Sequence, residues 1–450
     1  MIACLPALAA LVWALAVMEV SRDPAAASDN LPSLNRFWIA SAACWSTLTA
    51  LAFLLTREPE HTQHGGRTIL VVALVARVLI VATHDPGLSD DLWRYLFDGR
   101  AVATGHNPYH TAPIEIDSGQ PRFPGEAELA SRLNYPELVT IYLPTSQLVF
   151  GAIARVGLGA GLSIDSSATL FRGVFALFDL LVVVVLLRVL RRRGKSPWWA
   201  ALYAWNPLVL TEIAGSGHQD ILGVLVMVIA LGIVDQRRDA TVRWSTVFAV
   251  GALVKPIPVA LAGFAARGVS LRRLLTGVAA GMGVAGLIMA PFALDGGVEA
   301  WNRWRETLGE FVDRWAFNGS IYPLILASLN DHDLAKWITA LLLTGVFVIL
   351  RIRRVSVWTA SRAFLFAALL LSTTAHPWYL LWSLCLIPIA FEPAVWIASL
   401  TLPWAYIVLN DVDGWTVPTW TPWIIYAPIY LALGWSVWRS WSASRVDSTE

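Results

Sequence analysis

The feature of this sequence that most constrains its fold is a series of long apolar segments with almost no charge. Runs such as Leu180–Leu187, Leu341–Leu350 and Phe364–Leu371 lie inside segments that approach the roughly 20 residues an α-helix needs to cross a bilayer. Of the 450 residues, 56% are hydrophobic and only 14% are charged, less charge than a soluble domain carries. The sequence predicts an all-α, polytopic membrane protein of about 12–14 transmembrane helices.

Composition excludes several other classes of protein. The net charge of +1 gives no reason to expect a nucleic-acid partner. Cys4, Cys44 and Cys385 all lie in apolar segments, without the spacing of metal ligands or of a disulfide framework. The segment 1–18 lacks a basic start, so we expect a first membrane helix there and no cleaved signal peptide.

Basic clusters orient the helices, because Lys and Arg gather in cytoplasmic loops. The clearest cluster contains Arg188, Arg191, Arg192, Arg193 and Lys195. Helices threaded between such clusters are expected near 1–18, 36–56, 68–84, 168–190, 197–213, 219–234, 273–293, 334–350, 360–374, 377–391, 394–409 and 422–440, with both termini inside. We expect 244–266 to form two short helices, because Pro256 and Pro258 interrupt it, and 143–157 to lie along the outer surface.

The same threading predicts one long external loop at 84–144, the most polar part of the chain and far longer than ordinary connections. No internal repeat is evident. We therefore expect a single transmembrane domain over 1–450, with 1–67 as additional N-terminal helices and 84–144 as a catalytic loop.

The segment 89–100 is the richest in polar side chains. Ser89 predicts a helix start and Gly99 a helix end. On that helix, Asp91, Arg94, Tyr95 and Asp98 share one face, with Asp90 beside them. A surface helix with i, i+4 ion pairs is the alternative. The position at the end of an apolar helix, opening the long loop, favours a functional site.

Further polar residues fall outside on this topology. Asn107 lies in a turn and Tyr142 in an aromatic segment, and either could be an ordinary membrane-interface residue. Glu212, His218 and Asp220 form one cluster, Lys255 lies between apolar runs, and His376 and Tyr379 lie between two spans. Lys255 is either a functional charge or a side chain that reaches the interface.

These residues suit the transfer of a sugar from a lipid phosphate. The leaving phosphate is a stable anion and takes no proton, so the site needs cations to hold it. It also needs one carboxylate to accept the proton of the incoming hydroxyl. Asp91, Lys255 and His376 on one face could supply both functions, and Arg303, Arg305 and Arg314 are further phosphate candidates.

Three charges fall within predicted spans: Arg77, Arg172 and Asp179. Charges inside a membrane are costly and are functional candidates by default. Arg172 and Asp179 are seven residues apart and share a helix face. A structural pairing that includes Arg77 is favoured over a transport pathway.

The chain resembles the bacterial GT-C mannosyltransferases that use polyprenyl-phosphate mannose. The motifs that carry the resemblance are Ser-Asp-Asp-Leu-Trp-Arg-Tyr-Leu-Phe-Asp-Gly-Arg at 89–100, Gly-His-Asn-Pro-Tyr at 105–109, Tyr-Pro at 135–136, Thr-Ile-Tyr-Leu-Pro at 140–144, Trp-Asn-Pro at 205–207, Gly-His-Gln-Asp at 217–220, Lys-Pro at 255–256 and His-Pro-Trp-Tyr-Leu-Leu-Trp at 376–382. One departure is Tyr142-Leu143-Pro144, where many relatives carry Tyr-Pro-Pro. The resemblance implies an inverting transferase in a bacterial plasma membrane, with its active site facing outside.

The resemblance also implies roles for residues. Asp91 would be the base, with Asp90 as the fallback. Lys255 would be a cation beside the donor phosphate, and His376 would lie near the donor phosphate or the acceptor. The remaining substrate-binding candidates are Arg94, Tyr95, Asp98, Asn107, Tyr142, His218, Asp220 and Tyr379.

The expected partners are a polyprenyl-phosphate sugar donor, a glycolipid or glycan acceptor and membrane lipids, with no cofactor and no metal. The sugar could instead be arabinose or glucose. A lipid or glycan transporter without chemistry is the alternative from another class. Transporters place their key charges near mid-membrane, often in paired repeats, whereas these polar residues gather at one face, which favours an enzyme.

Overall fold

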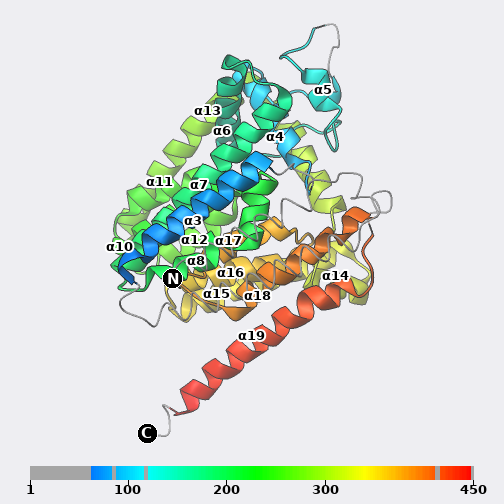
Figure 1. Cartoon of the computed structure of the whole chain (residues 1–450). Helices are drawn as coiled ribbons and strands as arrows, with labels where there is room; N and C mark the ends of the chain where they lie inside the picture. Colours follow the sequence, from blue (N-terminus) through cyan, green and yellow to red (C-terminus); the bar gives the residue numbers. More distant parts are fainter. Residues whose placement is uncertain (1–61, 84–87, 116–119, 411–415, 447–450) are drawn as a thin grey trace. The chain divides into compact units, whose positions relative to one another are not determined.

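The structure, a computed structural model, describes residues 62–83, 88–115, 120–410 and 416–446 (Figure 1). Within these ranges every regular element is a helix, which confirms the all-α class. The expected spans 1–18 and 36–56 lie outside the described residues, as do Cys4 and Cys44.

The chain packs as two compact units, and it passes between them several times. Unit 1 contains the described residues up to 76, then 186–210, and those from 316 onward. Unit 2 contains Arg77–Val185 and Thr211–Trp315. The expectation of a single transmembrane domain stays a prediction.

Four described helices are long and apolar enough to cross a membrane: α3 (Thr62–Thr83), α7 (Ile164–Arg192), α13 (Leu271–Arg314) and α15 (His332–Ile352). They lie where spans were predicted at 68–84, 168–190, 273–293 and 334–350. Helix α16 (Val357–Leu371) is apolar but shorter. The count of 12–14 spans stays a prediction, because several other expected spans are short or broken.

Two expected spans are not continuous helices, so those predictions were wrong. The segment 197–213 consists of a 3₁₀ turn (Pro197–Ala200), α8 (Ala201–Ala204), α9 (Pro207–Val209) and the start of a π-helical turn (Leu210–Gly215). Pro207 interrupts the helix, and the Asn206 side chain accepts the freed N–H of Leu208. Irregular backbone at membrane depth must be covered by protein, and residues 201–224 are all buried.

The second broken span is 377–391. A 3₁₀ turn (Pro377–Leu380) leads into the short helix α17 (Leu381–Leu384), and turns follow. Pro388 disfavours helix in the residue before it. The following span, expected at 394–409, is α18 (Pro393–Thr401) continued by a 3₁₀ segment (Leu402–Asn410). Unit 1 also contains α14 (Ile321–Leu329) and α19 (Thr421–Val446).

Unit 2 is built on α4 (Asp91–Ala103), α5 (Glu126–Ala130), α6 (Pro144–Gly159), α10 (Asp220–Gln236), α11 (Thr241–Ala252) and α12 (Ile257–Ala265), with most of α7 and with α13. Helices α11 and α12 confirm the two short helices expected at 244–266. Helix α13 changes direction at Gly297, where the backbone has φ +57°. In Figure 1, α4 and α5 lie at the same end of this unit.

Helices α4 and α6 pack so closely that glycine is required at their contact. A Cβ on Gly99 would lie 2.7 Å from the Phe150 carbonyl oxygen, and one on Gly151 would lie 2.5 Å from the Val102 side chain. The prediction that Gly99 ends the helix was therefore wrong. Gly99 serves close packing, and α4 continues to Ala103.

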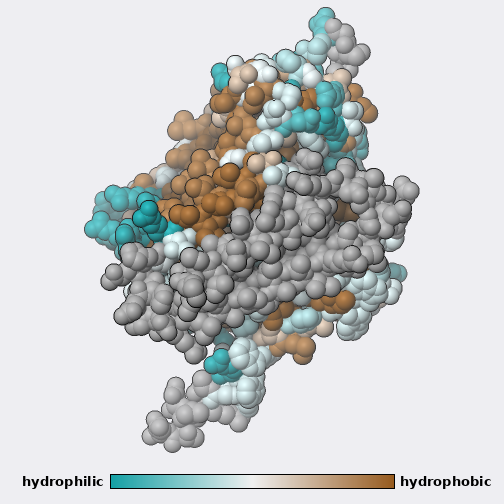
Figure 2. All heavy atoms as spheres, viewed as in Figure 1, coloured by the Kyte–Doolittle hydropathy of each residue, from teal (hydrophilic) through white to brown (hydrophobic). Residues whose placement is uncertain are grey.

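The long helices of unit 2 expose apolar side chains. Met282, Leu287 and Leu294 of α13 and Leu177 of α7 are 55–86% exposed. Figure 2 shows apolar side chains gathered on one face of this unit, with hydrophilic ones at its two ends. Lipid is the medium in which such a face is stable.

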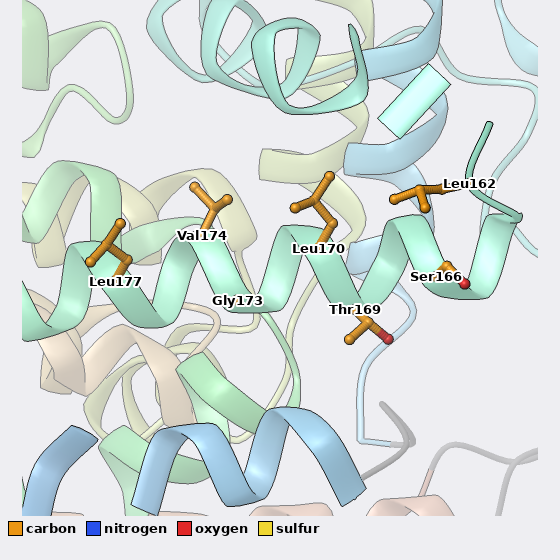
Figure 3. A pocket seen from close by; sticks show the side chains of 7 residues that line it. All are labelled: Leu162, Ser166, Thr169, Leu170, Gly173, Val174 and Leu177. Atoms are coloured by element: carbon orange, nitrogen blue, oxygen red, sulfur yellow. The ribbon is translucent and has the colours of Figure 1, made fainter. Parts of the chain in front are cut away.

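A shallow groove of about 510 Å³ follows α7 on this unit (Figure 3). Leu170, Val174 and Leu177 point to one side of the helix, whereas Thr169 points to the other. Gly173 leaves the floor of the groove open. A mostly apolar groove on a spanning helix is a surface that lipid chains can cover.

The buried charge pair Arg77–Asp179 joins α3 to α7 within unit 2. Arg77 Nε donates to Asp179 Oδ2 over 2.7 Å, and both side chains are 1% exposed. The predicted pairing that includes Arg77 is thus confirmed. Arg172 donates to the carbonyl oxygens of Val81 and Gly215, which ties α7 to α3 and to the π-helical turn.

Candidate active site

The site begins where α4 begins. Asp91 is the first residue of α4, and its backbone N–H lies 3.3 Å from the Ser89 hydroxyl. A carboxylate at a helix N-terminus is favoured by the exposed N–H groups there. Asp90 points elsewhere, because its carboxylate accepts a hydrogen bond from the Asn134 side chain over 3.0 Å. The structure therefore separates the two neighbouring acids, which the sequence could not.

Asp91 is linked to a buried histidine and through it to a second carboxylate. Asp91 Oδ2 lies 3.6 Å from His218 Nδ1, and His218 Nε2 lies 3.3 Å from Glu212 Oε2. The side chains of His218 and Glu212 are fully buried, while the Asp91 side chain is 38% exposed. The imidazole thus lies behind the Asp91 carboxylate, and the carboxylate keeps an open face.

His218 reaches this position because of the turn before it. Gly217 has φ +76°, and a Cβ there would lie 3.0 Å from Arg172 and 3.1 Å from Leu92. Glycine is the residue that takes this backbone conformation at no steric cost. The π-helical turn from Leu210 to Gly215 places Glu212 behind His218, whose backbone N–H donates to the Glu212 carbonyl.

Asp220 and Lys255 form an ion pair beside this chain of groups. Lys255 Nζ donates to Asp220 Oδ1 over 2.6 Å. The Asp220 side chain is 2% exposed and that of Lys255 is 24% exposed. Asp220 thus partly neutralises the positive charge of Lys255. Its exposed part still presents positive charge.

Tyrosines cover the other side of Asp91. Tyr95 follows Asp91 by one helical turn and donates its hydroxyl hydrogen to Asp91 Oδ2 over 3.3 Å. The ring of Tyr142 packs edge-on against Tyr95, with centroids 4.9 Å apart, and Phe150 stacks on Tyr95 at 4.8 Å. These rings exclude water from one side of the carboxylate.

The surroundings change the acidity of these groups. Partial burial, which removes water from the side of Asp91 that faces the protein, raises its pKa above the usual 3.8, and His218 and Lys255 oppose this shift. Burial, followed by the charge of Asp91, raises the pKa of Tyr95 and of Tyr142 well above 10. Both phenols remain protonated, so Tyr95 acts as a hydrogen-bond donor. A carboxylate with a raised pKa is a better proton acceptor.

Arg94 and Asp98 support the site from the same helix. Arg94 Nε donates to Asp98 Oδ1 and Gln147 Nε2 donates to Asp98 Oδ2, both over 3.0 Å. Asp98 is 1% exposed, and Arg94 also donates to the Leu138 carbonyl. The predicted shared face of α4 is confirmed, and its members are tied to the loop before α6.

Four helix termini meet around Asp91. Ser146, near the start of α6, donates to Gln219 at the start of α10 over 2.7 Å. Thr145 donates its backbone N–H to the Leu253 carbonyl at the end of α11. The start of α4 completes the group through Asp91 and His218. Residues from 91 to 255 are thereby collected at one place in unit 2.

Asn107 and Tyr109 hold the loop against α13. Asn107 Nδ2 donates to the Phe292 carbonyl over 2.9 Å, and its Oδ1 accepts the Tyr109 N–H. Tyr109 donates its hydroxyl hydrogen to the Tyr142 carbonyl over 2.6 Å. These contacts give Asn107 a structural task. Its predicted role in substrate binding stays a prediction.

His376 and Tyr379 lie in unit 1. The His376 ring stacks on Trp378 with centroids 4.1 Å apart and meets Tyr379 edge-on at 5.4 Å. Phe317 packs nearby, at 4.9 Å. Their association with the Asp91 cluster stays a prediction.

Two residues that complete the site were not predicted to have a catalytic or binding role. Glu212 is a fully buried acid behind His218, and Gln147 is a fully buried donor to Asp98. The signal for Glu212 was a carboxylate in an otherwise apolar stretch, six residues before His218. Gln147 had no comparable signal.

The arginines of the second half of α13 were proposed as phosphate ligands. Arg303 pairs with Glu115 over 2.5 Å and donates to the His110 carbonyl. The positive charge of Arg303 is therefore already partly neutralised. Arg305 is exposed on the helix surface, and the side chain of Arg314 lies outside the described part of the chain.

Among the described residues, no group of three His, Cys, Asp or Glu side chains has a geometry that could hold a metal ion.

Comparison with known proteins identifies the family. Residues 4–271 match the model of the family described as "Alpha-(1->6)-mannopyranosyltransferase, N-terminal domain", which is more than half of the chain. A curated relative, GPI mannosyltransferase 1 of Gibberella zeae, is 44% identical over 69 residues. That match covers 14% of this chain and 16% of the relative, so the chain spans a small part of that relative's length. This chain belongs to the alpha-(1->6)-mannopyranosyltransferase family.

Proposed function

We propose that the protein transfers a mannosyl group from a polyprenyl-phosphate donor to a hydroxyl group of a glycolipid or glycan, and that the linkage formed is α-(1→6). The family match supports mannose over arabinose or glucose, and supports an enzyme over a transporter. The observation that carries the proposal is Asp91, an open carboxylate held by Tyr95 and by the buried His218–Glu212 pair.

The proposed step is a single displacement. The acceptor oxygen attacks C1 of the mannosyl group as the bond from C1 to the phosphate oxygen breaks, which inverts C1. Asp91 takes the proton of the acceptor hydroxyl, and the polyprenyl phosphate leaves with the bonding electrons as an anion. Lys255, the exposed end of the Asp220–Lys255 pair, balances part of the charge on that anion.

The remaining groups position the base. His218 and Glu212 hold the rear of the Asp91 carboxylate, and Tyr95 donates a hydrogen bond to it. Arg94 and Asp98 anchor the start of α4 to the loop before α6. We place this site at the outer face of a bacterial plasma membrane, as the positions of the basic clusters predict.

The direct test is transfer by the purified protein in detergent or nanodiscs. Labelled polyprenyl-phosphate mannose would be supplied with a synthetic acceptor, an octyl α-(1→6)-dimannoside. We expect a labelled trisaccharide whose new linkage is α-(1→6) by linkage analysis. Transfer only from a nucleotide sugar, or none from any lipid-phosphate sugar, would reject the proposed donor.

Lys255 provides a first quantitative prediction. Replacing Lys255 with Met should raise the donor KM about tenfold, because a charge-assisted contact to phosphate is lost. The single variant also leaves the buried Asp220 without its ammonium partner. The matched variant therefore combines Lys255→Met with Asp220→Asn. If Lys255 serves only to neutralise Asp220, the double variant will regain the wild-type donor KM.

A second prediction concerns metals. We expect transfer to proceed at full rate in EDTA, because the leaving group carries one phosphate and its charge can be balanced by side chains. The rate would be measured before and after EDTA treatment, with Mg²⁺ or Mn²⁺ added back. Loss of activity that either ion restores would contradict this.

A further inference from the structure

A second cavity in unit 2 has a different chemical character from the Asp91 cluster. It has a volume of about 600 Å³ and lies between the loop at 135–139 and the second half of α13. Two aromatic rings, Tyr135 and Trp315, and three carboxylates, Glu137, Glu306 and Glu310, line it. Aromatic surface with a few polar groups is the usual composition of a small-molecule site.

The cavity adjoins the start of α4. Leu138 lines it, and the carbonyl oxygen of Leu138 accepts a hydrogen bond from Arg94 over 3.0 Å. Asn134, directly before Tyr135, donates to Asp90 over 3.0 Å. The stretch that forms one wall of the cavity is thus bonded to residues on both sides of Asp91 in the sequence. One wall of the cavity is therefore tied to the start of α4, where the proposed base lies.

The aromatic wall is held in an unusual conformation. Tyr135 has φ +56°, a region that bulky side chains rarely adopt, and the residue is 46% exposed. The ring lies 4.8 Å from that of Trp315, which in turn packs against Phe311 at 4.7 Å. Backbone strain of this kind persists at binding sites, where the surrounding structure enforces it.

The charge of the cavity selects its ligand. Three carboxylates face one guanidinium, that of Arg303, which is already paired with Glu115. Carboxylates in the cavity wall repel a phosphate group placed beside them. Among the described residues no group of acids has a geometry that could hold a metal ion. A neutral sugar fits both features, because its hydroxyl groups can donate to carboxylates and its C–H faces can pack on aromatic rings.

We propose that this cavity binds a sugar ring of the acceptor, with the phosphate donor held elsewhere. Its role as the acceptor site rests on the proposed transferase function, whereas its affinity for a neutral sugar does not. Trp315 and Tyr135 would supply the stacking surface. Glu306 and Glu137 would accept hydrogen bonds from sugar hydroxyls and orient the ring toward Asp91.

The test compares Glu306→Gln and Trp315→Ala with the control Glu299→Gln. Glu299 is an exposed acid of the same helix that does not line the cavity, so its replacement removes the same charge. Trp315→Phe keeps a ring and should restore most of the function if Trp315→Ala loses it. Transfer would be measured against the concentration of the octyl α-(1→6)-dimannoside and, separately, of the lipid donor. Binding of the dimannoside to the protein in nanodiscs would be measured by calorimetry.

We expect Glu306→Gln and Trp315→Ala each to raise the acceptor KM and the dimannoside Kd about tenfold. The donor KM should stay at the wild-type value, and Glu299→Gln should change neither constant. An active wild-type enzyme whose variants keep the acceptor KM would overturn the inference but leave the transferase proposal standing. Sugar binding that the variants lose, in a protein without transfer activity, would support the inference and reject the function. Absence of dimannoside binding by the wild-type protein would also overturn the inference.

Discussion

Replacing Asp91 with Asn is expected to lower the rate of mannosyl transfer by a factor of about 10²–10⁴, the usual contribution of a general base. The amide keeps the shape of the side chain and can still accept from Tyr95, but it cannot take a proton. Initial rates in membranes or nanodiscs, at saturating donor and acceptor, would measure the loss. The matched control is Asp90→Asn, which removes the neighbouring charge from a carboxylate that faces Asn134.

The pH profile gives an independent check on the role of Asp91. Its pKa is raised above 3.8, mainly because burial disfavours the charge. The base form disappears as the pH falls through this raised pKa. The wild-type rate should therefore decline on the acid side at a pH above the value for a free aspartate. A variant Asp91→Asn with wild-type rates, or a profile flat down to pH 4, would remove Asp91 as the base.

The same variant should be no less stable than the wild type at neutral pH. A carboxyl group whose pKa is higher in the folded than in the unfolded protein stabilises the fold only at low pH. That contribution to stability is fully present below the pKa that the carboxyl group has in the unfolded protein. It is lost as the pH rises through the pKa that the group has in the folded protein. At pH 7 the ionised Asp91 therefore lowers the free energy of unfolding, and its replacement by Asn removes this loss of stability. Thermal unfolding in detergent should show a melting temperature for Asp91→Asn that equals or exceeds the wild-type value.

Breaking the Arg77–Asp179 pair is expected to have the largest effect on stability. Arg77→Met would leave the Asp179 carboxylate, 1% exposed, without its guanidinium, at a cost of roughly 3–5 kcal/mol. Asp179→Leu would similarly leave a buried Arg77. The double variant replaces both charges by apolar groups, and we expect it to recover most of the loss. Equilibrium unfolding of all four proteins gives the coupling energy of the pair.

A matched control for Arg77 is Arg155→Met. Arg155 is an exposed residue of α6 whose guanidinium donates to the Ala103 carbonyl. Its replacement should cost less than about 1 kcal/mol. If the Arg77→Met protein unfolds at the same denaturant concentration as Arg155→Met, the pair does not stabilise the α3–α7 contact. If the double variant is as unstable as the singles, an unpaired charge is not the cause.

The sequence was sufficient for the class of fold and for the polar segments that form the site. Hydropathy is a local property, so α7 and α15 were predicted within a few residues of their ends. The i, i+4 spacing was likewise enough to place Arg94 and Asp98 side by side. Hydropathy failed at 197–213 and 377–391, because an apolar segment buried by protein can be irregular where a lipid-exposed one cannot.

Only the tertiary structure decided which polar residues of unit 2 meet. Asp90 and Asp91 are alike in sequence, and what distinguishes them is that Asp91 lies beside His218 while Asp90 lies beside Asn134. The pairing of Lys255 with Asp220 joins positions 35 residues apart, and Glu212 gains a role only because a π-helical turn places it behind His218. Such contacts depend on how helices pack against one another, and the pattern of residues within one helix does not predict them.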